Sequence, residues 1–159
     1  MKKLSIICLP GLDNFLHWSA RLASKYEVKI FLVSNINDIQ AALEWSDIIW
    51  LEWANESAIE ALKQFDLMSP LAKGNKKIVC RLHSYEALSG YVPQLKAKLL
   101  DRLIFVSDYL KEITLPQLNH VPECVVIPNG VDMVNIPYLD LRPGFNIAVV
   151  GGKIGRASL

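Results

Sequence analysis

The densest group of polar side chains in the sequence lies in the segment 81–86 (RLHSYE), at the end of an apolar run. In an extended chain Arg81 and His83 point to the same side, because side chains alternate with a period of two. An imidazole can orient or deprotonate a hydroxyl near neutral pH, a guanidinium can hold a carboxylate or phosphate, and a carboxylate such as Glu86 accepts hydrogen bonds from sugar hydroxyls. We therefore predict that these three side chains take part in binding or catalysis.

A second candidate is Glu52, which lies between Trp50 and Trp53 at the end of another apolar run. Aromatic faces with a hydrogen-bond acceptor beside them suit the apolar faces and hydroxyl groups of a sugar. The same pattern also fits a tryptophan-rich edge of the core with the Glu52 carboxylate in solvent. The sequence leaves both interpretations open.

Two turns that contain glycine follow other apolar runs. Gly11 comes after the first run, where a glycine at the mouth of a helix lets backbone amides approach a phosphate or a sugar hydroxyl. An ordinary tight turn is the simpler explanation of that glycine. The run at 124–128 leads into Asn129-Gly130, a pair that permits a tight turn with positive φ, and Asp132 follows.

The elements that must position these residues are short apolar runs rich in Ile, Val and Leu. They lie at 4–9, 28–34, 47–53, 77–83, 102–107, 124–128 and 145–150, with helix-like stretches at 14–25, 37–45, 55–67 and 107–118. Near-continuous apolar runs suit strands buried between two helical layers. The alternation predicts an α/β fold with a doubly wound, Rossmann-like parallel sheet. In such sheets ligands bind at the carboxyl ends of the strands, so the candidate residues should share one edge.

Local signals mark where two of the helices begin. Asn55 can cap the helix at 55–67, and Ser57 with Glu60 has the spacing of a capping box. Ser107 follows the fifth run and fits a helix cap as well as a ligand contact.

Composition narrows the class of protein. The 159 residues are 52% hydrophobic and carry 17 basic and 16 acidic side chains, a net charge of +1. Such a chain is not intrinsically disordered, and it lacks the basic excess of a nucleic-acid-binding protein. Its three cysteines form no CxxC pair, which favours reduced thiols in the cytoplasm. The motifs GxSxG, GxxxxGK[ST] and HExxH are absent, which argues against a serine hydrolase, a P-loop nucleotide hydrolase and a zinc protease. Because the paired-carboxylate motif DxD is absent as well, we expect no metal.

The order of these motifs resembles a known enzyme family. The Gly11 loop, His83, the run 103–107 (LIFVS) and the string 126–132 (VIPNGVD) are together similar to the amino-terminal half of a family-four, GT-B-type glycosyltransferase. The resemblance spans roughly residues 4–150. It implies a two-domain retaining enzyme that moves a sugar from a nucleotide-sugar donor to an acceptor and needs no cofactor or bound metal.

The resemblance also implies roles for individual residues. Gly11 would lie near the donor phosphates, and His83 would be the catalytic residue beside the reacting sugar. The remaining substrate contacts would be Glu52, Arg81, Glu86, Asn129, Gly130 and Asp132. The partners implied are a nucleotide sugar and a glycan or lipid-linked acceptor, with no nucleic acid.

The resemblance sets the expected domain organisation. A Rossmann-like acceptor-side domain would span 1–135, a linker rich in proline and glycine 136–144, and the start of a truncated donor-binding domain 145–159. This chain alone should then lack turnover.

Other interpretations stay open beside this one. The chain also fits a non-catalytic Rossmann-like module that binds a sugar or nucleotide, or a nucleotide-dependent oxidoreductase or epimerase of similar fold. The basic, amphipathic stretch 93–102 fits a solvated helix better than a peripheral contact with the inner face of the membrane.

Overall fold

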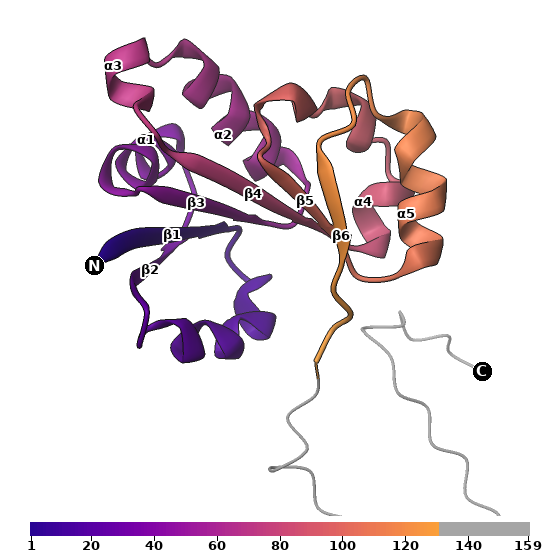
Figure 1. Cartoon of the computed structure of the whole chain (residues 1–159), viewed down its shortest axis with the longest axis horizontal. Coiled ribbons are helices and arrows are strands. Elements are labelled where there is room, and N and C mark those ends of the chain that lie inside the picture. Colours follow the sequence, from indigo (N-terminus) through magenta and orange to yellow (C-terminus); the bar gives the residue numbers. More distant parts are fainter. Residues whose placement is uncertain (131–159) are drawn as a thin grey trace, which may run out of the picture. The chain divides into compact units, whose positions relative to one another are not determined.

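The computed structural model describes residues 1–130, apart from the side chains of residues 14, 15, 17, 18 and 20. Within this part of the chain one sheet of six parallel strands has the order β2-β1-β3-β4-β5-β6 (Figure 1). The strands are β1 (Lys2–Cys8), β2 (Tyr26–Leu32), β3 (Ile48–Glu52), β4 (Lys77–Leu82), β5 (Arg102–Phe105) and β6 (Glu123–Val126). The predicted α/β, doubly wound parallel sheet is confirmed.

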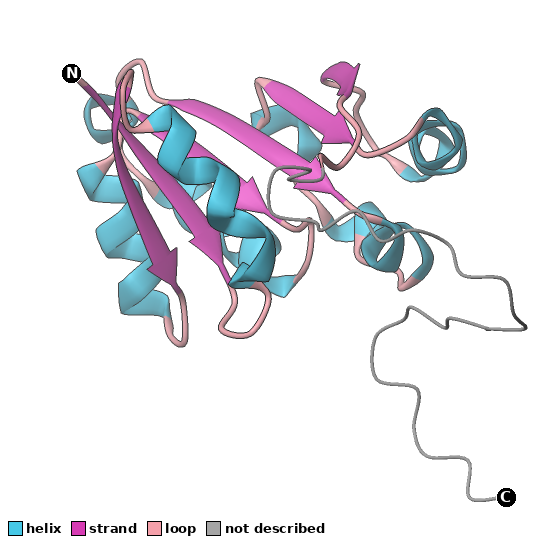
Figure 2. Cartoon of the chain, turned by 90° about the horizontal axis from the view of Figure 1, so that it is seen from below, coloured by secondary structure: helices cyan, strands magenta, loops and turns pink. Residues whose placement is uncertain are grey.

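Helices connect successive strands and lie beside the sheet (Figure 2). They are η1 (Asp13–Leu22), α1 (Ile36–Trp45), α2 (Glu56–Leu67), α3 (Pro70–Lys73), α4 (Ser84–Leu88), η2 (Val92–Gln94), η3 (Ala97–Leu99), α5 (Asp108–Thr114) and η4 (Leu115–Gln117). The larger core cluster joins the strands to α1, α2, α4 and α5, whereas a smaller cluster joins β1 to η1. The two helical layers are therefore unequal.

The strand order reverses around β1, which pairs with β2 on one side and β3 on the other. This reversal creates the crevice at the carboxyl edge where ligands bind in open α/β sheets. The register of the neighbouring pair places Glu52 of β3 directly opposite Arg81 of β4. The fold thus brings two candidate residues side by side.

Strand β2 departs from the expected burial. Ile30 and Leu32 are 40% and 44% exposed, although the apolar run predicts a strand covered on both faces. The reason is its position, since β2 forms an edge of the sheet.

The helix caps are partly as predicted. Asn55 caps α2, with its side-chain oxygen accepting hydrogen bonds from the Ser57 backbone N–H at 3.1 Å and from the Ser57 hydroxyl at 2.7 Å. The predicted capping box between Ser57 and Glu60 is wrong, because Glu60 instead accepts a hydrogen bond from Gln64. Ser107 caps α5 by accepting from the Leu110 N–H at 3.2 Å, which favours the cap over a ligand contact.

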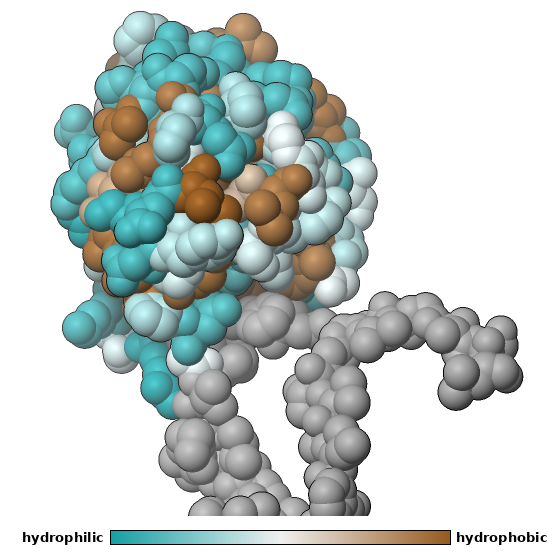
Figure 3. All heavy atoms as spheres, turned by 90° about the vertical axis from the view of Figure 1, so that its right-hand side faces the viewer, coloured by the Kyte–Doolittle hydropathy of each residue, from teal (hydrophilic) through white to brown (hydrophobic). Residues whose placement is uncertain are grey.

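The stretch 93–102 does not form one amphipathic helix. It contains parts of two short turns, η2 and η3, with Leu95 fully buried between them. Lys96 forms an ion pair of 2.7 Å with Asp66. On the face near α4 and α5, apolar residues are scattered among polar ones (Figure 3). No helix in residues 1–130 has the length and apolar character needed to cross a bilayer.

Residues Met1–Asn129 form one compact unit. The predicted linker at 136–144, the strand at 145–150 and the candidate Asp132 lie outside the described residues.

Candidate functional site

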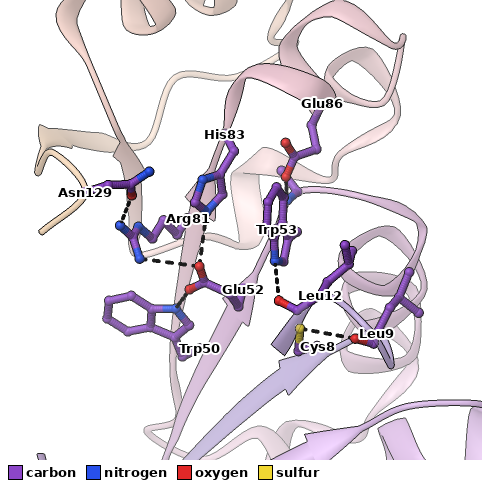
Figure 4. Close-up of polar contacts among 11 residues, drawn as sticks. Cys8, Leu9, Leu12, Trp50, Glu52, Trp53, Arg81, His83, Glu86 and Asn129 are labelled. Atoms are coloured by element: carbon purple, nitrogen blue, oxygen red, sulfur yellow. Dashed lines mark hydrogen bonds and ion pairs between the residues drawn. The ribbon is translucent and has the colours of Figure 1, made fainter. Parts of the chain in front are cut away.

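Glu52, the last residue of β3, is the centre of a buried polar cluster (Figure 4). Its side chain is 0% exposed. One carboxylate oxygen accepts a hydrogen bond from the Trp50 indole at 2.7 Å. The other lies 3.4 Å from the Arg81 guanidinium and 3.1 Å from the His83 Nε2 atom. The interpretation that leaves Glu52 in solvent is therefore wrong, and both oxygens are engaged by protein groups.

Arg81 connects this cluster to the segment that follows β6. Its side chain is 10% exposed, and its guanidinium lies beside Glu52 and also donates to the side-chain oxygen of Asn129. Asn129 itself is exposed. Three strand ends that are far apart in the sequence, those of β3, β4 and β6, thus meet at one edge through Glu52, Arg81 and Asn129.

His83 lies between the Glu52 carboxylate and the indole of Trp53. The imidazole and indole rings are stacked, with centroids 4.0 Å apart and an angle of 25° between their planes. The His83 residue is 5% exposed and Trp53 is half-buried. Trp53 has φ of 75°, a left-handed conformation that is unusual for a residue with a Cβ atom.

The loop after β1 contacts this site through its backbone. The Trp53 indole N–H donates to the Leu12 carbonyl at 3.1 Å. Neighbouring Gly11 is exposed and has φ of 84°, and a Cβ atom there would meet nothing within 4 Å. The positive φ therefore explains why a glycine occupies this position, as in an ordinary tight turn. No close approach requires it within the described residues.

Glu86 lies in the first turn of α4, on the other side of Trp53 (Figure 4). The residue is 0% exposed, and its Oε1 atom accepts a hydrogen bond from the Ala54 N–H at 2.8 Å. The Oε2 atom is buried without a hydrogen-bond partner among the described residues. Burial raises the pKa of this carboxyl group, although backbone N–H groups oppose the shift.

Cys8 ends β1 close to the cluster and is an inert thiol. Burial raises its pKa to about 12, and the negative charges of Glu52 and Asp13 add to the shift. Its Sγ atom lies 3.4 Å from the Leu9 carbonyl. Cys8, Cys80 and Cys124 are all free, as the sequence predicts.

The structure thus brings together five of the predicted residues, namely Glu52, Arg81, His83, Glu86 and Asn129. Gly11 is one residue from a contact with Trp53. Gly130 is exposed, and neither it nor Asn129 has positive φ, so the left-handed turn that this pair permits does not form at these positions.

Sequence reasoning missed the contributions of the backbone. The Leu12 carbonyl and the Ala54 N–H hold Trp53, and no side-chain motif marks either of them. The sequence suggests that Trp53 offers its face to a sugar, whereas one face stacks on His83. The aromatic and polar residues in the sequence indicated where the site lies, but they did not indicate that Trp53 stacks on His83.

No protein-family model, curated protein or solved structure matches the chain. Its function must therefore be inferred from its own residues and their geometry.

Proposed function

We propose that this domain is the acceptor-binding part of a retaining glycosyltransferase, which moves a sugar from a nucleotide-sugar donor to a glycan or lipid-linked acceptor. The observation that carries the proposal is the meeting of His83, Arg81 and Asn129 at the carboxyl edge around buried Glu52. A parallel sheet presents its ligand site at this edge. The motifs that resemble the family contribute two of these residues, His83 and Asn129.

In this proposal some residues orient their neighbours and others contact the acceptor. Glu52 has both oxygens engaged, so it orients Arg81 and His83 and leaves the acceptor to other groups. The exposed amide of Asn129 is the polar group that meets a sugar hydroxyl first, and His83, which is 5% exposed, lies behind it. The Gly11 loop faces the donor, which a second domain would bind for the most part.

The same proposal gives a setting for the enzyme. It works in the cytoplasm, at the inner membrane face when its acceptor is lipid-linked. It uses no metal or other cofactor of its own.

The alternative is a non-catalytic module that binds a sugar or a nucleotide. It is favoured by the low exposure of His83, 5%, which leaves little of the imidazole for chemistry before the site rearranges. The acceptor-binding domain should prefer glycans, whereas a module that binds a nucleotide should prefer nucleotide sugars.

A binding experiment separates them. The chain is titrated with a panel of oligosaccharides and, separately, with nucleotide sugars, and heat or NMR line shifts are recorded. We expect oligosaccharide binding that is lost in His83→Ala and kept in the control His120→Ala, whose histidine is exposed and precedes the amino end of β6. Tight binding of nucleotide sugars with no response to glycans would favour the module. If His83→Ala and His120→Ala change oligosaccharide binding equally, the carboxyl edge is not the binding site.

A further inference from the structure

The Trp53 backbone needs an explanation, because the left-handed conformation is unfavourable for any residue with a Cβ atom. Such a conformation persists only where surrounding contacts hold it. Among the described residues, two hydrogen bonds hold this turn. The indole N–H donates to the Leu12 carbonyl, and the N–H of the next residue, Ala54, donates to Glu86.

Glu86 holds this turn from a different element. The loop that contains Trp53 follows β3, whereas Glu86 belongs to α4, which follows β4. His83 precedes the same helix at its N-cap position, three residues before Glu86. One short helix therefore carries both the ring on which Trp53 stacks and the carboxyl group that fixes the Trp53 backbone.

The second oxygen of Glu86 argues against a purely stabilising role. A buried carboxyl oxygen without a partner costs free energy, and an apolar or amide side chain would avoid part of that cost. Complete burial also separates both oxygens from any ligand at the surface in this arrangement. The sequence predicts that Glu86 contacts the substrate, but its position suits the support of a neighbour instead.

We propose that Glu86 is a positioning residue, whose bond to the Ala54 N–H holds Trp53 in its left-handed turn and so keeps the indole stacked on His83. The proposal deepens the proposed function, since the orientation of His83 decides what an acceptor meets. The role of Glu86 is tested without any ligand. It can therefore fail while the acceptor-binding function stands, and the acceptor-binding function can fail while the role of Glu86 stands.

The stack itself supplies the readout. An indole ring 4.0 Å from an imidazole shifts the imidazole C–H protons upfield in an NMR spectrum, and exposed His120 provides an unstacked reference in the same chain. We expect His83 to lose most of its upfield shift in Glu86→Ala. Glu86→Gln keeps a carbonyl acceptor for the Ala54 N–H and should retain the shift. Glu112→Ala, which removes an exposed carboxylate from α5, should leave it unchanged.

A second comparison separates this role from general stability. Glycine adopts positive φ without strain, so in a Trp53→Gly background the turn no longer needs to be held. Glu86→Ala should then reduce the urea midpoint less than it does in the natural chain. If Glu86→Ala alone does not fold, recovery of folding in the double variant supports the proposal. An unchanged His83 shift in folded Glu86→Ala, an equal loss of midpoint in both backgrounds, or an unfolded double variant overturns it.

Discussion

Replacing Glu52 by glutamine tests whether this carboxylate is the centre of the site. The side chain is 0% exposed, and Arg81 and His83 beside it are 10% and 6% exposed at the side chain. Glutamine keeps the shape and one acceptor but removes the charge. Removing one partner of a buried ion pair costs about 3–5 kcal/mol. Because the amide oxygen still accepts one hydrogen bond, we expect a loss of about 3 kcal/mol in the free energy of unfolding.

The chain contains a matched control for this substitution. Arg102 and Glu123 are also directly opposite each other on neighbouring strands and form an ion pair. Their side chains are 47% and 65% exposed, so the solvent screens the pair. Glu123→Gln makes the same chemical change and should cost about 0–1 kcal/mol. The two sites differ in burial and in the contacts that Glu52 makes with Trp50 and His83 besides Arg81.

Urea unfolding followed by circular dichroism measures both variants, and the slope of each transition checks that the folding remains two-state. Adding Arg81→Met to Glu52→Gln should recover part of the loss, because the unpaired guanidinium is removed. A cost for Glu52→Gln within about 1 kcal/mol of the Glu123→Gln cost would refute the assigned role of Glu52. So would a further loss in the double variant.

Two other substitutions test the neighbourhood of the site. Burial raises the pKa of the Glu86 carboxyl group in the folded chain above its unfolded value of about 4.3. The stability that this group contributes is therefore fully present below the unfolded pKa. It is lost as pH rises through the folded pKa. Between those two pKa values, the free energy of unfolding of Glu86→Gln, measured in urea, should rise relative to that of the natural chain by about 1.4 kcal/mol per pH unit. Parallel curves of unfolding free energy against pH for the two proteins would contradict this prediction. Asn55→Ala removes the cap of α2 and its bond to Ser57, which should cost about 1–2 kcal/mol in the same assay, whereas a change below about 0.3 kcal/mol would show that the cap is dispensable.

The sheet could be predicted from the sequence because its signals are local. All six strands lie at the predicted apolar runs, with ends that differ by a few residues. Once the sheet is parallel, the carboxyl ends of its strands share one edge. The convergence of Glu52, Arg81 and Asn129 then follows from topology without any knowledge of side-chain conformation.

The details of the site could not be predicted, because they depend on which strands become neighbours. The sequence left Glu52 in solvent or at a ligand, and only the pairing of β3 with β4 places Arg81 opposite it. The left-handed turn at Trp53 depends on the carboxyl group of Glu86, which belongs to another element, and on the Leu12 carbonyl. The stretch 93–102 does not form one helix because the backbone is extended at Leu95 and Leu100, where the turns η2 and η3 end.

The cluster around Glu52 is costly for a structural element. Desolvating a carboxylate and a guanidinium is offset only partly by their mutual attraction, and apolar side chains of similar volume stabilise a protein as well or better. Glu52, Arg81 and His83 therefore do more at this edge than fill space. Their bonds fix the orientation of an imidazole that has little solvent exposure, next to an exposed amide at Asn129. Such a fixed group suits selection among ligands by geometry, which supports the proposal that this edge binds an acceptor.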